Sequence, residues 1–352
     1  MIHMFYEFIN IEDVLKNNPN LVQHITNIAS GMIEDSYDNN LLAHCAAMYY
    51  INANQSSNSV EKHRDNSKSF SKIMEDKVYF LHSAEKYFKM SIKNGYYQDN
   101  YNIGMIYKIR GKLEMALEYL YNIDEADDFL YMNAIYEIGL IHENLENFKE
   151  AEEYYLKSIE LGLIRANCNL GVLYFNQQKY ELAEKYFKND SSDLSIYNLA
   201  ILYDTINKYD LAEEYYLKSI ANDNMNAVFD LAVMFFAIEK YEEALKYFKT
   251  STNTKSYYYI GVIKYKENDF PSALKYLLKS IRCSHMLVDS YYYLGLIYEK
   301  ENKEEDAIKY YKKASEYNHV DAIYNLASIY HKNDNVIMSK FYFNLFNRYK
   351  ND

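Results

Sequence analysis

The segment AEEYYLKSI occupies residues 151–159 and recurs, letter for letter, at residues 212–220. A nine-residue segment repeated 61 residues further on indicates a chain built from copies of one structural unit. Repetition constrains the fold more strongly than length does, because 352 residues would otherwise suggest two or three ordinary globular domains. The copies of this segment are therefore the first guide to the fold.

Aligning the copies places a small residue at one position of every unit, a tyrosine three residues later and a bulky residue directly after that tyrosine. The small residues, which we call helix B markers, are Ala84, Ala116, Ala151, Ala183, Ala212, Ala244, Ala273, Ala307 and Ser339. Positions separated by three and four residues share one face of an α-helix. The pattern therefore predicts a helix, helix B, that buries a small residue beside an aromatic one.

A second series of small residues precedes the first by 12 positions. These helix A markers are Gly104, Gly139, Gly171, Ala200, Ala232, Gly261, Gly295 and Ala327. Their successive spacings are 35, 32, 29, 32, 29, 34 and 32 residues. Each unit is thus predicted to be a hairpin of two helices whose small residues allow close approach. The two 29-residue spacings lack three residues after YFKND and YFKTS, which predicts a shorter helix B in those units.

The hairpin NKYDLAEEYYLKSI resembles the tetratricopeptide repeat, with Ala212 and Tyr216 in its small and aromatic positions. The junction KYYKKASEYNHVDAIYNLASIY resembles the Sel-one-like subclass, although the longer glycine-bearing hairpin loop of that subclass is missing. This hybrid resemblance covers about residues 80–346. It implies an all-α fold, a right-handed α-solenoid of about eight to nine helix-turn-helix repeats. Proteins of this kind usually serve as adaptors, chaperone partners or assembly scaffolds.

Three regions are expected along the chain. Residues 1–40 are predicted to form N-terminal capping helices, and residues 41–100 an irregular first repeat with a polar insertion near 52–75. Residues 101–352 are predicted to form the tetratricopeptide/Sel-one-like repeat solenoid. Only 9 glycines and 2 prolines are present, which agrees with a largely helical chain.

The amino-acid composition limits the cellular compartments and the classes of partner to be expected. The net charge of −12 disfavours binding to nucleic acid or to an anionic membrane, and no apolar run is long enough to cross a bilayer. Three widely spaced cysteines favour a reducing compartment, so we expect a cytoplasmic protein. The richness in tyrosine, asparagine, lysine and isoleucine resembles that of proteins from large DNA viruses and AT-rich protists. A viral origin would imply the host cytoplasm.

Motifs for catalysis are missing from the sequence. It contains neither a glycine-rich phosphate loop nor an H-E-x-x-H metal motif, and five of the nine glycines are already used in helix packing as helix A markers. Paired carboxylates such as Glu213 and Glu214 recur early in helix B, where they suit the helix dipole on a solvated face. We therefore expect no enzymatic activity, no cofactor and no metal.

The face of helix A opposite helix B is predicted to bind a protein or peptide along the concave groove. Two residues before the helix A marker stand Asn102, Glu137, Asn169, Asn198, Asp230, Tyr259, Tyr293 and Asn325. A row of amides can pair with the backbone of an extended peptide, as in the asparagine ladder of some tetratricopeptide proteins. Alternatively, these asparagines cap or bridge neighbouring helices. Five residues after the marker, Lys266, Lys300 and Lys332 form a basic stripe that can receive an acidic segment or can serve solubility alone.

The end of the repeat array is a second candidate interface. Phe343 and Phe346 of the last helix B are predicted to form an open apolar end that pairs with itself or docks on a partner. Alternatively, the two side chains fold back on Tyr324 and Tyr330 of the same unit. The sequence thus favours a non-enzymatic interaction scaffold, with a self-associating structural protein as the first alternative. Binding of single-stranded RNA is a weaker one, because it needs a basic groove.

Overall fold

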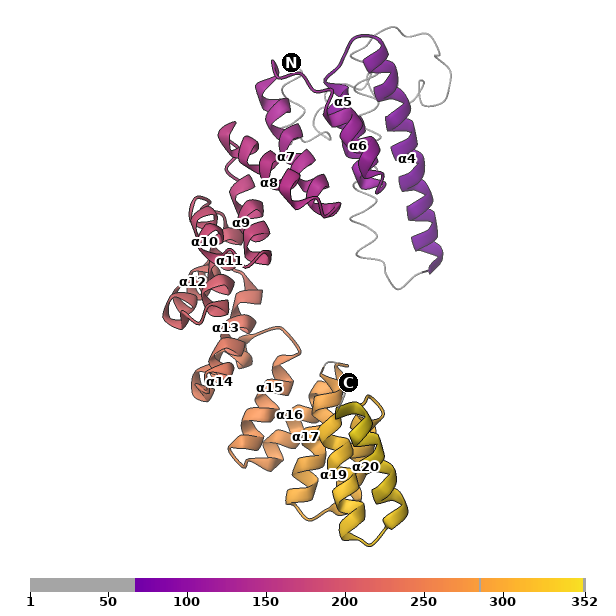
Figure 1. Ribbon diagram of the computed structural model, residues 1–352, viewed down its shortest axis with the longest axis vertical. Coiled ribbons are helices and arrows are strands. Elements are labelled where there is room, and N and C mark those ends of the chain that lie inside the picture. The colour runs from indigo at the N-terminus through magenta and orange to yellow at the C-terminus, as the bar shows by residue number, and fades with distance from the viewer. Residues whose placement is uncertain (1–66, 285, 351–352) are drawn as a thin grey trace. The chain divides into compact units, whose positions relative to one another are not determined.

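The computed structural model describes residues 67–284 and 286–350, and within these ranges every regular element is an α-helix (Figure 1). In chain order the helices are α4 (Ser67–Lys93), α5 (Asp99–Ile109), α6 (Leu113–Leu120), α7 (Asp128–Asn144), α8 (Phe148–Glu160), α9 (Ala166–Asn176), α10 (Tyr180–Lys188), α11 (Asp193–Thr205), α12 (Tyr209–Ala221), α13 (Met225–Ala237), α14 (Tyr241–Thr250), α15 (Ser256–Lys266), α16 (Phe270–Arg282), α17 (Leu287–Lys300), α18 (Glu304–Ser315), α19 (Val320–Lys332) and α20 (Val336–Lys350). The capping helices predicted in residues 1–40 and the beginning of the irregular first repeat predicted at 41–100 lie outside the described residues. So does most of the predicted insertion, whose last residues belong to α4.

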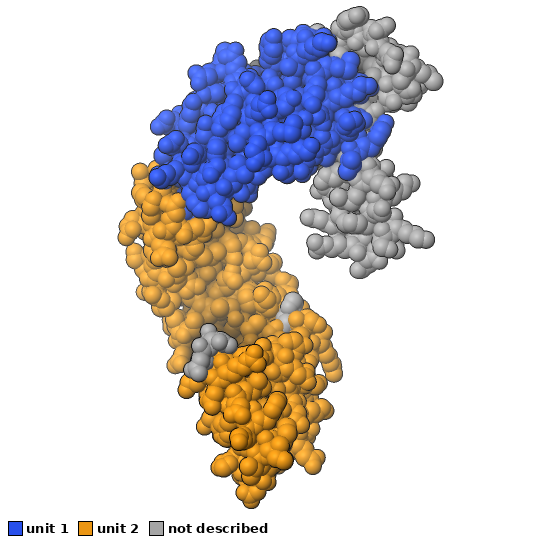
Figure 2. Space-filling view, turned by 45° about the vertical axis from the view of Figure 1, so that its right-hand side comes forward, with its two compact units in different colours: residues 1–173 blue, residues 174–352 orange. Residues whose placement is uncertain are grey.

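The chain divides into two compact units, Met1–Leu173 and Tyr174–Asp352, and the division falls within α9 (Figure 2). In the first unit, α5 packs on α6 and α7 packs on α8, while α4 packs on α5. In the second unit the packed pairs are α11 with α12, α13 with α14, α15 with α16, α17 with α18 and α19 with α20. The odd-numbered helices from α5 to α19 carry the helix A markers, and the even-numbered helices carry the helix B markers. The all-α hairpin repeat predicted from the sequence is confirmed.

Close packing within each hairpin explains the small residues. A Cβ atom added to Gly104 would lie 2.7 Å from the Leu120 side chain, and one added to Gly261 would lie 2.7 Å from Leu277. Such distances are shorter than real Cβ contacts, so only glycine fits without movement of the facing side chain. The facing residue is in each case the bulky residue four positions after the helix B marker. The pairing of small residue and bulky residue is therefore a contact between helices A and B of the same repeat.

Helix lengths follow the spacing of the repeats. Helices α10 and α14 have 9 and 10 residues, whereas α8, α12 and α16 each have 13. The shortening predicted from the two 29-residue spacings is confirmed. The spacing did not predict that α6 has only 8 residues. There the chain leaves the helix early, and α7 begins after Asp127, whose side chain accepts a hydrogen bond from the backbone N–H of Leu130.

Every hairpin loop turns through one left-handed residue, seven positions after the helix A marker. These residues are Gly111, Glu146, Gln178, Asn207, Glu239, Asn268, Asn302 and Asp334, with φ between 55° and 70°. A residue in the left-handed backbone conformation after a helix allows the chain to reverse direction. Glycine and asparagine adopt this conformation at the lowest cost in free energy. Three of the eight loops instead use glutamate or glutamine, so packing of the flanking helices holds the turn.

Candidate functional site

Burial along each helix A identifies its solvent-facing side. The residue five positions after the marker is exposed in all eight repeats: Ile109, Asn144, Asn176, Thr205, Ala237, Lys266, Lys300 and Lys332. The residue two positions before the marker is half-buried in seven repeats, and Glu137 is buried. We call the side that carries these two series the helix A surface. It is the face that the sequence predicted to be available to a partner.

The asparagines of this surface make contacts within the protein. The Nδ2 atom of Asn169 donates to the Tyr136 hydroxyl at 2.8 Å, which joins two successive helices A. Asn102 donates to Asp99 Oδ1 of its own helix at 3.0 Å. Asn198 is half-buried on α11. Asn169 thus bridges two neighbouring helices, which is the second of the two roles expected for these asparagines. Peptide binding by their amides stays a prediction.

An aromatic series lies three residues before each helix A marker, which the sequence reasoning missed. Its members are Tyr101, Tyr136, Tyr197, Phe229, Tyr258, Tyr292 and Tyr324, with Cys168 in the remaining repeat. Tyr136 lies 6.1 Å from the Tyr155 ring, and Phe229 lies 5.9 Å from the Phe248 ring of the same hairpin. The signal was present in the sequence, because seven of eight residues at this offset are aromatic. It is weak beside the marker series, since aromatic residues are frequent throughout this chain.

The hydroxyl of each fully buried tyrosine of helix B lies close to a carboxylate of helix A. The Tyr155 hydroxyl donates to Glu143 at 2.5 Å, and the Tyr311 hydroxyl donates to Glu299 at 2.7 Å. The Tyr216 hydroxyl lies 3.4 Å from Asp204. All three carboxylates stand four residues after the helix A marker.

Where helix B carries leucine or phenylalanine instead, that position holds Lys108, Phe175, Phe236, Tyr265 or His331. An acid thus stands at this position only opposite a buried hydroxyl, which needs an acceptor once it leaves water.

The second unit gathers aromatic side chains from three successive helices A. We call Phe229 and Phe236 of α13, Tyr259 and Tyr265 of α15, and Tyr293 of α17 the aromatic surface. Tyr259 lies 5.9 Å from Phe229 and 5.1 Å from Phe236, both edge-on, and Tyr265 lies 5.4 Å from Tyr293. All five side chains are half-buried, so each packs on the protein and still reaches solvent. The predicted residues Tyr259 and Tyr293 belong to this one surface.

Tyr258 connects the two halves of the aromatic surface. Its ring lies 5.2 Å from Tyr259 and 6.1 Å from Tyr293. Tyr259 also stacks on the ring of the buried Phe248, at 5.0 Å with an 8° angle between the planes. Tyr259 is therefore held in place by rings from its own and neighbouring helices.

Lysine and carboxylate groups border the aromatic surface. Lys266 Nζ donates to the Tyr241 hydroxyl at 2.7 Å and lies 5.1 Å from the centre of that ring. The hydrogen bond to Tyr241 raises the pKa of Lys266. On the other side, burial raises the pKa of Tyr259, and the carboxylates of Asp289 and Asp230 raise it further. The surface is thus aromatic at its centre and charged at its margins.

The remaining predicted lysines lie elsewhere. Lys300 is exposed at the end of α17. Lys332 lines a cleft of about 350 Å³ together with Glu299 and Glu304. The structure thus places Lys266 at the aromatic surface and Lys332 beside two acids.

The last predicted asparagine, Asn325, lies on α19. Burial raises the pKa of Tyr311, and a hydrogen bond from Asn325 opposes that rise, which places Asn325 beside this tyrosine of α18. Asn325 therefore also contacts the protein itself, and its binding to a partner stays a prediction.

In the last helix, Phe343 and Phe346 lie against α19. Their rings are 6.2 Å and 5.2 Å from Tyr324, which is the arrangement of the fold-back alternative. Docking through these two residues stays a prediction. The most exposed apolar side chains of α20 are Val336, Ile337 and Phe341, which are 72%, 82% and 55% exposed.

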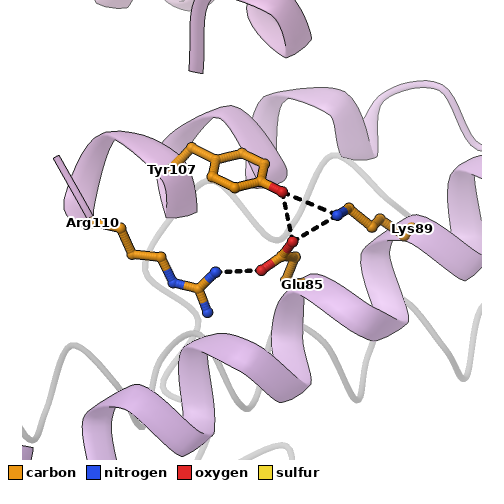
Figure 3. A network of polar contacts seen from close by, with 4 residues as sticks. All are labelled: Glu85, Lys89, Tyr107 and Arg110. Carbon is orange, nitrogen blue, oxygen red and sulfur yellow. Dashed lines mark hydrogen bonds and ion pairs between the residues drawn. The ribbon is translucent and has the colours of Figure 1, made fainter. Parts of the chain in front are cut away.

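The first unit contains a polar network that the sequence did not predict (Figure 3). Glu85 Oε1 of α4 accepts hydrogen bonds from Lys89 and from the Tyr107 hydroxyl of α5, each at 2.6 Å, and Glu85 Oε2 pairs with Arg110. Burial by itself would raise the pKa of Glu85, but the hydrogen bonds from Lys89, Tyr107 and Arg110 lower it to about 2. The network therefore fastens α4 to α5.

The part of the chain that the structure describes offers neither a metal cluster nor a membrane-spanning helix. Within residues 67–284 and 286–350, no group of three or more His, Cys, Asp or Glu side chains could hold a metal ion. In the same ranges no helix is long and apolar enough to cross a membrane.

Together, the hairpins and the solvent-facing side of their helices A define an α-solenoid protein built from helix-turn-helix repeats. Two family models, both described as tetratricopeptide repeat, match the sequence. One matches residues 133–161, 164–189 and 288–318, and the other matches residues 197–256. The chain therefore contains tetratricopeptide repeats within these segments. The Sel-one-like part of the resemblance stays a prediction.

Solved structures similar to this chain are tetratricopeptide repeat proteins and related molecules. The C-terminal part of a repeat protein from Cytophaga hutchinsonii has a TM-score of 0.50 and 15% identity, with 60% of this chain and 93% of that chain covered. A tetratricopeptide repeat protein from Parabacteroides merdae has a TM-score of 0.42 and 20% identity, with 65% and 93% covered. PilF from Pseudomonas aeruginosa has a TM-score of 0.44 and 20% identity, with 59% and 97% covered. No curated protein sequence matches this chain.

Proposed function

We propose that this protein is a non-enzymatic scaffold that binds a partner polypeptide along its helix A surface, with the aromatic surface as the principal contact. The single observation that carries this proposal is the clustering of Tyr259, Tyr265 and Tyr293 with Phe229 and Phe236. Half-buried aromatic side chains offer a large apolar contact area and lose little conformational freedom on binding. Tetratricopeptide repeats are a scaffold architecture, which supports the same function.

The arrangement also favours a polypeptide over a nucleic acid. The helices A of the described chain carry carboxylates that would repel a phosphate backbone, among them Asp204, Asp230, Asp289 and Glu299. An extended peptide can instead place alternate side chains on the rings while its backbone meets the amides and hydroxyls. We expect the partner to be a protein or a peptide segment in the cytoplasm.

Substitution at the aromatic surface tests this function. Tyr259→Ser combined with Tyr293→Ser should abolish recovery of the partner when the tagged protein is purified from its native cell and bound proteins are quantified by mass spectrometry. The matched control is Tyr97→Ser combined with Tyr317→Ser, because these side chains are 64% and 57% exposed on other surfaces. Circular dichroism melting of all variants verifies that the helices remain folded. Recovery of the same proteins by wild type and both double variants would refute the proposal.

Self-association through α20 is a second candidate function. Ile337 and Phe341 are exposed on one face of this helix and the exposed Val336 precedes them, and exposed apolar patches commonly mark interfaces. Ile337→Glu with Phe341→Glu should abolish any concentration-dependent increase in sedimentation coefficient, as should the predicted pair Phe343→Glu with Phe346→Glu. A wild-type protein that sediments as a monomer over a wide concentration range would remove this candidate.

A further inference from the structure

The charged groups around the aromatic surface indicate which kind of partner would bind there. This inference rests on the proposed function. Burial raises the pKa of Tyr259, and two carboxylates raise it further: Asp289, four residues before Tyr293 on α17, and Asp230, one residue after Phe229 on α13. Tyr197 donates a hydrogen bond to Asp230, and the His319 ring lies 3.8 Å from Asp289. Both carboxylate side chains are half-buried beside the rings.

The first unit shows how this repeat combines a cation with an aromatic residue of helix A. Arg165 stands six residues before its helix A marker, and its guanidinium lies 4.5 Å from the centre of the Tyr136 ring of the preceding repeat. The same guanidinium donates to Asn133 Oδ1 at 2.7 Å. The protein thus supplies its own cation over that tyrosine, and stacking of a guanidinium on a tyrosine is favourable.

At the aromatic surface the corresponding position holds the opposite charge. Asp289 is the residue six positions before Gly295, and the tyrosine of the preceding repeat is Tyr258. Asp289 and Tyr293 stand four residues apart on α17, and the Tyr293 ring lies 6.1 Å from the Tyr258 ring. Burial raises the pKa of Tyr258, and the Asp289 carboxylate raises it further. Where Tyr136 has an arginine of its own chain, Tyr258 has a carboxylate that attracts a cation.

Of the cations near this region, Lys264 and Lys266 have other partners, whereas Lys255 acts on Asp230. Lys264 pairs with Glu267 at 2.6 Å, and Lys266 bonds to Tyr241. Lys255 is exposed and lowers the pKa of Asp230, which burial raises. Glu299 adds a further negative charge near Tyr265, because burial and this carboxylate both raise the pKa of Tyr265.

We infer that the aromatic surface binds a polypeptide segment in which an aromatic side chain stands next to an arginine or lysine. The aromatic side chain packs on Tyr259 and Tyr293, and the carboxylates of Asp230 and Asp289 attract the cation. This assigns a basic partner to the surface, whereas the lysine stripe in the sequence suggested an acidic one. Charge complementarity selects the partner, and the rings supply most of the contact area.

Synthetic peptides test this inference directly. The probe is a fluorescein-labelled Gly-Ser peptide of about twelve residues that carries Tyr-Arg pairs. One comparison peptide has Glu in place of Arg, and another has Ser in place of Tyr. Fluorescence anisotropy at low salt should show the Tyr-Arg peptide binding at least about tenfold more tightly than either comparison peptide.

Neutral variants identify the groups responsible. Asp230→Asn with Asp289→Asn should weaken binding of the Tyr-Arg peptide about tenfold or more and remove the preference over the Tyr-Glu peptide. The matched control, Glu242→Gln with Glu243→Gln, removes the same charge from an exposed part of α14 and should bind like wild type. Equal binding of the Tyr-Arg and Tyr-Glu peptides, or equal effects of the two double variants, would overturn the inference. If the native partner is nevertheless lost on changing Tyr259 and Tyr293, the proposed function stands without this partner chemistry.

Discussion

At the scale of single residues, the buried tyrosines show how one repeat position controls another. A tyrosine four residues after the helix B marker occurs with an acid four residues after the helix A marker, at Tyr155, Tyr216 and Tyr311. Burying a hydroxyl without an acceptor costs free energy, and a carboxylate removes that cost at the hairpin interface. The residue four positions after the helix A marker therefore depends on whether the facing residue of helix B carries a hydroxyl.

A double-mutant cycle measures this coupling. Tyr155→Phe and Glu143→Leu should each lower the free energy of unfolding, and the double variant should be more stable than the sum of the single effects predicts by about 1–2 kcal/mol. The matched pair Tyr216→Phe with Asp204→Leu should show weaker coupling, because its oxygens are 3.4 Å apart and those of Tyr155 and Glu143 are 2.5 Å apart. Urea unfolding gives both values. Additive effects in both cycles would contradict the pairing.

A second residue-scale prediction concerns the left-handed loop residues. Glu239 has φ of 62°, a conformation that costs a residue with a Cβ atom about 1–2 kcal/mol. Part of the gain on changing it to glycine is lost to the larger entropy of the unfolded chain, so Glu239→Gly should stabilise by up to about 1 kcal/mol. Asn207→Gly should change stability less, because asparagine tolerates this conformation. Thermal melting compares the two, and an equal or larger gain for Asn207→Gly would contradict the explanation.

At the scale of helices, the Glu85 network holds α4 against α5 and makes that contact pH-dependent. The folded-state pKa of Glu85 is about 2, below its usual 4.5, so the network stabilises fully above about pH 4.5 and loses its contribution as the pH falls toward 2. Glu85→Gln should therefore destabilise by about 1–2 kcal/mol at pH 6 and have little effect near pH 2.

Melting temperatures of the wild type and Glu85→Gln across this pH range test the prediction. The exposed Glu114→Gln of the neighbouring α6 serves as the control and should follow the wild-type curve. A difference between Glu85→Gln and the wild type that stays constant down to pH 2 would show that the carboxylate charge is not responsible.

Most of the helical framework could be predicted from the sequence, because it depends on short-range spacing. Gly104 and Ala116 could be assigned to facing helices from their 12-residue separation alone, and the shortening of α10 followed from three missing residues. The early end of α6 could not, since it depends on a loop whose Asp127 begins the next helix. The Glu85 network also escaped prediction, because its residues come from different helices. Glu184, Lys188 and Tyr203 hold the corresponding repeat positions, and Lys188 and Tyr203 likewise donate hydrogen bonds to Glu184 between α10 and α11.

At the scale of the whole molecule, the sequence located the solvent-facing side of helix A but not its principal feature. Tyr259 and Tyr293 were found because they share an offset from the markers. Phe236 and Tyr265 were missed, because the position four residues after the marker changes from acidic to aromatic between repeats. Only the three-dimensional structure shows that these offsets meet on α13, α15 and α17.

The central claim is that a partner polypeptide binds at the aromatic surface, and site-specific photo-crosslinking tests it most directly. Lys266, which is exposed at the margin of this surface, would be replaced by p-benzoylphenylalanine, and Lys246 on the exposed face of α14 would be replaced in the control protein. Irradiation in the native cell should join position 266, but not position 246, to one polypeptide partner. Mass spectrometry of the adduct should locate the linked residue in a segment containing an aromatic and a basic side chain. Crosslinking from position 246 alone, or equal labelling from both positions, would contradict the account.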